Sequence, residues 1–464
     1  MEIRKVLLLL LLMLPALVSS AQNEFASVQL PSKTIDGYWI VPDDQGNICI
    51  QYFKKPYLYF EIYGRNGSRT IQIKEPFKYT PEIIGGTFSD GKYGFYLKPR
   101  SIKKEGDIGA FIVDANSNKL ENIQHHRIRA INTEEISGYL DNGSDLFVFV
   151  QIRGNNKLKI VRLNPSQTME SRQFEVPAII SKSFASLEPT LFVDPLGPKS
   201  IYSCQLTKKA YINGRNITLT FDQKAQFKTH LWTIFWDTDN NELTSLPEEK
   251  MVFGKSSNAY LLNNWLYRWT IDDVKIDLSV YDLLSGDLIQ SYKHNGEEPI
   301  PFQSGPAYLI DEYGARHSLT TMRNEKLFKT FSNGYPSIYV DRINRGNVKV
   351  TMGAFNDVAT GLTIGGGFGS FGGAGGVAIG GSRQITGTRR GSTYFQTNLT
   401  YPGLEVTKTD NFLTPNDRII RYIENKGLDP RYISAKVYQY SEDKLHLAYI
   451  DRKDFNIKIL EFIR

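Results

Sequence analysis

Short apolar runs that alternate with polar side chains recur along most of this chain. Two clear examples are 146–150 (Leu-Phe-Val-Phe-Val) and 157–161 (Lys-Leu-Lys-Ile-Val), which flank the polar turn 153–156. Val, Ile, Thr, Tyr and Phe are frequent throughout, and these residue types suit a pleated, half-buried strand. Asn, Asp, Gly and Ser separate the runs, so the pattern predicts antiparallel strands joined by hairpin turns.

One turn recurs, in which an apolar strand ends at or near Asp or Asn and polar residues follow. Its copies begin near residues 64, 114, 164, 237, 282 and 451. An Asp or Asn in this place can accept hydrogen bonds from the backbone two residues later and close a tight reversal. The first three copies are about 50 residues apart. Such a period, with several short strands in each unit, is typical of propeller blades.

This pattern resembles the generic β-propeller superfamily, without pointing to a particular family within it. The resemblance implies an all-β propeller of roughly six to eight blades over residues 22–464. Two β-sandwich or barrel domains are the alternative, because they also have regular strands and turns. Residues 206–228 are interpreted as an insertion in the fourth unit, and the count is lost between 290 and 430. One helix is predicted, beginning at Asn416 and ending at Gly427.

Residues 1–21 have the parts of a secretory signal peptide. A charged start at 2–5 is followed by an apolar run at 6–18 and by small side chains at 19–21. Thirteen apolar residues span only about 20 Å of helix, short of the roughly 30 Å hydrocarbon layer of a bilayer. The sequence therefore predicts cleavage after Ala21 and export to the periplasm, the outer surface or the extracellular space. The Ser-Ala-Gln exit resembles those of exported Bacteroidetes proteins.

The charge pattern bears on the class of partner, and the two cysteines bear on disulfide bonding. The formal net charge of +6 falls to +5 once the signal, with one Glu, one Arg and one Lys, is removed. Both signs are interspersed without a Lys/Arg block, so no nucleic-acid partner is expected. Cys49 and Cys204 are the two cysteines. Either one disulfide or two buried thiols fits their apolar surroundings.

Residues 358–382 (Val358 to Ser382) differ from the rest in composition. They carry no charged side chain, and 11 of the 21 residues at 361–381 are Gly. Glycines spaced by four would form a small-residue helix face suited to packing in lipid. In water, however, that many Gly residues cost a helix about 10 kcal/mol relative to Ala. The segment is interpreted as an irregular insertion, with an ordered contact surface or membrane insertion as alternatives.

One turn is the closest approach to a cation site. It offers four oxygen-bearing side chains in the manner of a calcium loop: Asp237, Asp239, Asn241 and Glu248. Glu242 occupies the position where such a loop needs Gly for its sharp bend. A hairpin turn explains the same residues. No cofactor is therefore expected, and calcium is the alternative that these residues leave open.

Complete catalytic motifs are absent from the sequence. There is no serine elbow and no paired-histidine zinc motif, and the six histidines are scattered: His125, His126, His230, His294, His317 and His446. The leading hypothesis is an exported, non-catalytic binding or scaffold protein of the cell envelope or extracellular space, with a protein, peptide or glycan ligand. One alternative is a propeller enzyme acting on polysaccharide or peptide. The other is a protein that contacts membranes through 358–382.

Overall fold

The computed structural model describes most of residues 22–463. The longer stretches outside it are 1–21, 101–106, 247–255, 360–387 and most of 409–435, and shorter gaps fall in several loops. Within the described residues the regular structure is almost entirely β, which confirms the all-β prediction. The predicted signal peptide lies outside the described residues, as does the Gly-rich segment beyond Ala359.

The described strands form seven sheets, which we letter A to G. Sheet A contains β29 (Lys436–Ser441), β30 (Lys444–Asp451), β31 (Asn456–Ile463) and β1 (Gln22–Gln29). Sheet B contains β2 (Tyr38–Pro42), β3 (Ile48–Lys54), β4 (Tyr57–Tyr63) and β5 (Arg69–Pro76). Sheet C contains β6 (Pro81–Ser89), β7 (Lys92–Pro99), β8 (Asp107–Asp114), β9 (Lys119–Leu120) and β10 (Gln124–Arg127). Sheet D contains β11 (Glu134–Asp141), β12 (Leu146–Ile152), β13 (Lys157–Leu163) and β14 (Glu170–Glu175).

The remaining sheets are built alike. Sheet E contains β15 (Thr190–Phe192), β16 (Lys208–Asn213), β17 (Asn216–Gln223), β18 (Lys228–Phe235) and β19 (Asn240–Ser245). Sheet F contains β20 (Ser256–Leu262), β21 (Trp265–Ile271), β22 (Lys275–Asp282) and β23 (Leu288–Asn295). Sheet G contains β26 (Tyr335–Asn344), β27 (Asn347–Ala359), β28 (Thr388–Thr400), β24 (Tyr308–Ile310) and β25 (Arg316–Ser318). Short helices accompany them: η1 (Ala178–Ile180), α2 (Ser181–Ala185), α3 (Ile201–Cys204), η3 (Trp236–Thr238) and α4 (Asn324–Ser332).

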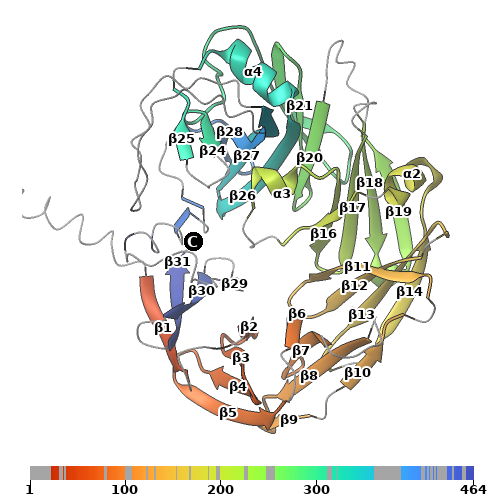
Figure 1. Cartoon of the computed structure of the whole chain (residues 1–464), viewed down its shortest axis with the longest axis vertical. Coiled ribbons are helices and arrows are strands. Elements are labelled where there is room, and N and C mark those ends of the chain that lie inside the picture. Colours follow the sequence, from red (N-terminus) through yellow and green to blue (C-terminus); the bar gives the residue numbers. More distant parts are fainter. Residues whose placement is uncertain are drawn as a thin grey trace, which may run out of the picture.

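The sheets follow one another around a common centre (Figure 1). Hydrogen bonds join neighbouring sheets. Between sheets B and A, the Tyr38 hydroxyl donates to the Ala448 carbonyl at 2.8 Å. The Tyr93 hydroxyl donates to Asp43 between sheets C and B, also at 2.8 Å. Sheet A is itself assembled from both ends of the chain, because β1 pairs antiparallel with β31.

Two residues of the predicted helix at 416–427 link the last sheet to the first. Residues 417, 418, 422 and 425 are helical, and the rest of that segment lies outside the described residues. Asp417 accepts a 2.9 Å bond from Lys349 of sheet G. The Tyr422 hydroxyl lies 3.1 Å from the hydroxyl of Tyr449 in sheet A. At its described positions the helix prediction is therefore confirmed.

The interpretation of 206–228 as an insertion is wrong. These residues supply β16 and β17, two neighbouring strands of sheet E, in antiparallel register from Lys208 with Phe221 to Asn213 with Asn216. The turn between them contains Gly214 with φ of 59°, a conformation that glycine adopts at little cost. The segment is thus an ordinary hairpin.

The two cysteines do not pair. Cys49 lies in β3 and Cys204 in α3, and both are buried free thiols. Burial raises the pKa of each thiol, so both stay protonated at neutral pH. The sequence allowed either one disulfide or two buried thiols, and the structure contains two buried thiols.

Candidate functional site

One face of sheet E carries polar side chains in rows that run across its strands. Successive residues of a strand point to opposite faces, so residues two apart share a face. Register places Tyr211 opposite Thr218, Thr218 opposite Thr233, and Thr233 opposite Glu242. The next row contains Asn213, Asn216 and Phe235. These rows put phenol, hydroxyl, carboxylate and amide groups on one surface.

Where this face meets sheet F it encloses a hollow of about 180 Å³. Both sheets line it, through the two rows of sheet E and through the turns that follow β20 and β22. Its polar lining includes four asparagines and three threonines: Asn213, Asn216, Asn263, Asn264, Thr218, Thr233 and Thr244. Of the described residues that line it, Glu242 is the one with a charged side chain. The hydrogen-bonding groups of the hollow are therefore nearly all neutral, and the rest of its lining is apolar.

The floor of the hollow is aromatic. Tyr211 of sheet E and Tyr260 of sheet F are buried, and their rings meet edge to face with centroids 5.6 Å apart. Burial raises the pKa of both phenols well above the usual range, so each keeps its proton at neutral pH. A buried, protonated tyrosine combines an apolar ring with a hydroxyl donor.

Four apolar residues of sheet F, which we call the leucine shoulder, are Leu283 and Leu284 in the turn after β22 and Leu288 and Ile289 at the start of β23. Leu283 and Leu284 belong to the lining. Leu284 is 80% exposed, and Leu288 and Ile289 are exposed as well. Scattered single exposed leucines are ordinary, whereas a group beside a concave surface is typical of an interaction site.

The far end of the same junction is closed by buried charge. Lys209 Nζ donates to Asn258 Oδ1 at 2.8 Å and lies 3.7 Å from Asp222 Oδ2. Asp222 also accepts from the backbone N–H of Ala259 at 3.0 Å and from the Thr229 hydroxyl at 2.7 Å. Since Lys209 lies near the start of β16 and Asn213 at its end, the junction is fixed at one end and open at the other.

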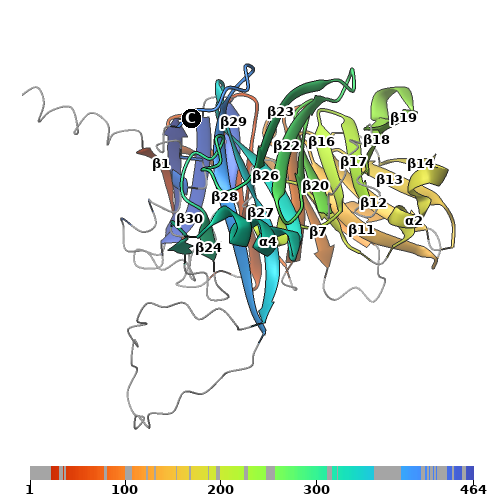
Figure 2. The same ribbon diagram turned by 90° about the horizontal axis from the view of Figure 1, so that it is seen from above.

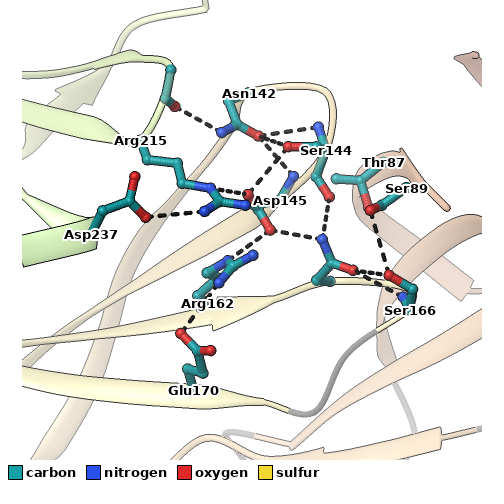
Figure 3. A network of polar contacts seen from close by, with 12 residues as sticks. Thr87, Ser89, Asn142, Ser144, Asp145, Arg162, Ser166, Glu170, Arg215 and Asp237 are labelled. Carbon is teal, nitrogen blue, oxygen red and sulfur yellow. Dashed lines mark hydrogen bonds and ion pairs between the residues drawn. The ribbon is translucent and has the colours of Figure 1, made fainter. Parts of the chain in front are cut away.

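The junction of sheets C, D and E holds a second polar network, which we call the Asp145 clasp (Figure 3). Asp145 Oδ1 accepts from Arg162 Nε at 2.7 Å and from Asn164 Nδ2 at 2.8 Å. Its other oxygen lies 3.3 Å from Arg215 Nε of sheet E. The Asn142 amide donates to the Gly214 carbonyl at 2.7 Å. These bonds tie the turn after β11 to the β16–β17 turn.

The clasp fixes the charge of Asp145. Burial acts to raise the pKa of this carboxyl, but bonds from Asn164 and Arg162 and the charge of Arg215 outweigh it, and the pKa is lowered. Asp145 is therefore ionised at neutral pH, opposite two arginines. The polar side chains of the clasp bind one another, which indicates that the clasp is a structural joint.

Of the predicted calcium residues, Asp237 lies at the outer end of this network, and Asp239 and Asn241, which follow it in the chain, have other partners. Asp237 accepts from Arg215 NH1 at 3.0 Å, and Asp239 lies 3.4 Å from Arg172 NH1. Asn241 Oδ1 accepts a 3.0 Å bond from the Trp232 indole. Glu248 lies outside the described residues, so the calcium site stays a prediction.

The remaining candidate groups are spread over the molecule. The six histidines lie in β10, β18, β23, β25 and β30, which belong to five sheets. Among the described residues, no three His, Cys, Asp or Glu side chains gather in a way that could hold a metal ion. In the same part of the chain, no helix has the length and apolar character needed to cross a bilayer.

Comparisons with known proteins give a weak structural likeness. No family model matches the sequence, and no curated protein is similar to it. A variant of the Synechocystis apocarotenoid oxygenase matches with a TM-score of 0.29 and 9% identity, over 57% of this chain and 62% of that chain. The cobalt-substituted Synechocystis enzyme matches with a TM-score of 0.28 over the same shares, at 9% identity. This chain thus spans about three-fifths of those chains, and at these values the likeness supports no inference about its residues or activity.

Proposed function

We propose that this is an exported, non-catalytic binding or scaffold protein that holds its ligand in the hollow between sheets E and F. The observation that carries the proposal is the lining of that hollow. It combines an aromatic floor with a rim of neutral amides and hydroxyls, and a few such polar groups around an apolar interior are characteristic of binding sites. Export follows from residues 1–21, as argued from the sequence.

The ligand that fits best is an extended polypeptide segment with an apolar side chain. The leucine shoulder continues the apolar surface outward from the hollow. Asparagine side chains can both donate to and accept from a peptide backbone. Glu242 favours a ligand that is neutral or positively charged. A peptide lying along the shoulder would place one side chain in the hollow.

The architecture that we propose for this role is a closed, seven-bladed propeller. Pairing of β1 with β31 and the contacts of Asp417 and Tyr422 support closure. A closed ring is expected to unfold in one cooperative transition, with fluorescence and circular dichroism coinciding. Two separate transitions would instead favour a pair of sandwich domains.

Binding is tested on an array of synthetic peptides that vary in their apolar residues. We expect the mature protein to retain peptides with a Leu, Phe or Ile anchor. Asn213→Trp places an indole at the rim of the hollow and should weaken that retention by about tenfold or more. Asn116→Trp, at an exposed turn of sheet C, is the matched control and should bind like the wild type.

Two outcomes would contradict the proposal. If the wild type retains no peptide, the ligand class is wrong, and retention on a neutral glycan array would replace it. If Asn213→Trp binds peptides as well as the wild type, the hollow is not the site. Circular dichroism of both variants establishes that neither change alters the fold.

A further inference from the structure

The hairpin of β27 and β28 reaches beyond the rest of its sheet. Strand β26 accompanies β27 only as far as Phe355, and β24 pairs with β28 only at 392–394. The last four pairs, from Asn356 with Gly391 to Ala359 with Thr388, have no third strand among the described elements. Figure 2 shows these two strands extending past the other sheets on one side of the molecule.

Exposed tyrosines lie at the level where the hairpin leaves the sheet. Tyr335 pairs in register with Phe355, the last residue of β27 that β26 accompanies. The ring of Tyr202, from α3, packs edge to face against Phe355 with centroids 4.8 Å apart. Tyr335 is 50% exposed and Tyr202 is 57% exposed. Two large aromatic rings thus stand half in water beside the departing hairpin.

A cationic aromatic cluster lies across the same sheet. Tyr308 of β24 pairs with Tyr394 of β28, and their rings are 5.6 Å apart. The guanidinium of Arg316, in β25, stacks 3.5 Å above the centre of the Tyr308 ring. Arg316 is itself exposed. We call Tyr202, Tyr308, Tyr335 and Arg316 together the tyrosine girdle.

The sequence that the hairpin carries is the least charged in the chain. No Asp, Glu, Lys or Arg occurs from 358 to 382, and the first charges after it are those of Arg383, Arg389 and Arg390. Beyond Asp357, which pairs in register with Arg390, the residues that follow the girdle on the chain are therefore uncharged, glycine-rich and apolar, and Arg389 and Arg390 lie on the returning strand β28. This charge pattern is an observation separate from those that support ligand binding in the hollow between sheets E and F.

We propose that the tyrosine girdle is a docking surface for a lipid bilayer, with the hairpin directed toward it. Tyrosine rings favour the boundary between headgroups and acyl chains, because one end is apolar and the other is polar. Arg316 can donate a pair of hydrogen bonds to a lipid phosphate. The unpaired edges of the projecting hairpin disfavour deep insertion as a single copy. The protein would therefore lie on the membrane without spanning it.

The test is flotation of the mature protein with vesicles of phosphatidylethanolamine and phosphatidylglycerol. We expect the wild type to float with the vesicles. Replacing both exposed rings, by Tyr202→Ser with Tyr335→Ser, should lower the bound fraction by about tenfold. Leu284→Ser removes an even more exposed apolar side chain from the leucine shoulder and should leave flotation unchanged.

A second variant keeps the result interpretable if the double substitution disturbs folding. Arg316→Gln removes the phosphate-binding charge from an exposed position and should weaken flotation on these anionic vesicles, with less effect on vesicles of phosphatidylcholine. The proposal is overturned if the wild type does not float, or if the girdle variants float as well as the wild type. It is also overturned if those variants only convert a dimer into a monomer, since the girdle would then be a self-association surface. The girdle variants leave peptide binding at the hollow unchanged, whereas Leu284→Ser alters the leucine shoulder and not the girdle, so the two proposals fail separately.

Discussion

Sheet E meets its two neighbours in opposite ways. Toward sheet D, the Asp145 clasp fills the junction with charges whose partners are all supplied by the protein. Toward sheet F, one end is closed by Lys209 and Asp222, but the other end is lined by neutral amides and hydroxyls around a hollow. The same kind of strand therefore serves both a closed joint and an open one.

The difference follows from what each group costs when it loses water. A buried charge without a partner is strongly unfavourable, so the carboxylate of Asp145 requires a complete and closed set of donors. An amide or hydroxyl at a rim can keep its hydrogen bonds to water, and it exchanges them for a ligand at a small net cost. Charged junctions thus fix the sheets, whereas neutral junctions remain available for binding.

The largest expected effect comes from breaking the clasp with Asp145→Ala. This leaves Arg162, which is buried, without its main partner. Removing one member of a buried ion pair typically costs about 3–5 kcal/mol, so the urea midpoint should fall sharply. Glu170→Gln is the control, because Glu170 is a half-exposed partner of the same arginine and should cost less than about 1 kcal/mol. Equal losses in the two variants would show that the clasp is not a structural joint.

A smaller effect on the free energy of unfolding is expected when the pH is lowered. Because the folded pKa of Asp145 is lowered, its carboxylate stabilises the fold at any pH above the ordinary Asp value of about 3.9. That contribution is lost as the pH falls through the lower, folded pKa. The stability difference between the wild type and Asp145→Asn should therefore be constant from about pH 5 to 8 and shrink below about pH 4. Urea unfolding at a series of pH values measures it, and a difference that instead shrinks toward pH 8 would refute the assignment.

The smallest effect on stability is expected at the hollow. Thr218→Val keeps the shape of the side chain but removes a hydroxyl that lies 3.2 Å from the hydroxyl of Thr233. We expect a change in unfolding free energy within about 1 kcal/mol, together with weaker retention of peptides on the array. A loss as large as that of Asp145→Ala would mean that the hollow is a structural joint like the clasp.

The sheets and their turns could be predicted because both depend on local sequence. Asp114 accepts from the backbone N–H groups of Asn116 and Ser117, as its place at the end of a strand predicts. Asp282 does the same two and three residues onward. The turns expected near 64, 114, 164 and 282 follow the third strand of sheets B, C, D and F, and the turn near 237 follows the fourth strand of sheet E. Alternation and turn chemistry suffice for such elements.

The hollow could not be predicted, because it depends on how separate sheets pack. Asn213 and Asn264 are far apart in the sequence and come together only where sheet E meets sheet F. A usable signal did exist in the alternation of Lys209, Tyr211 and Asn213 before the turn at Gly214. Lys209 at the start of that run obscures this signal, because a lysine is rarely buried in a protein core unless it has a partner. Its partners, Asp222 and Asn258, are not adjacent in sequence.

The pairing of β1 with β31 sets an order of events for folding. Residues 22–29 have no strand to join until residues 456–463 have been made, so β1 is synthesised long before its partner and is among the last strands to find its place. Contacts this distant in sequence form slowly, because a long loop must close before they give any stability. Until then sheet A presents an open edge to other chains. Aggregation during synthesis should therefore begin at this edge, and a chaperone would protect the protein best by holding β1.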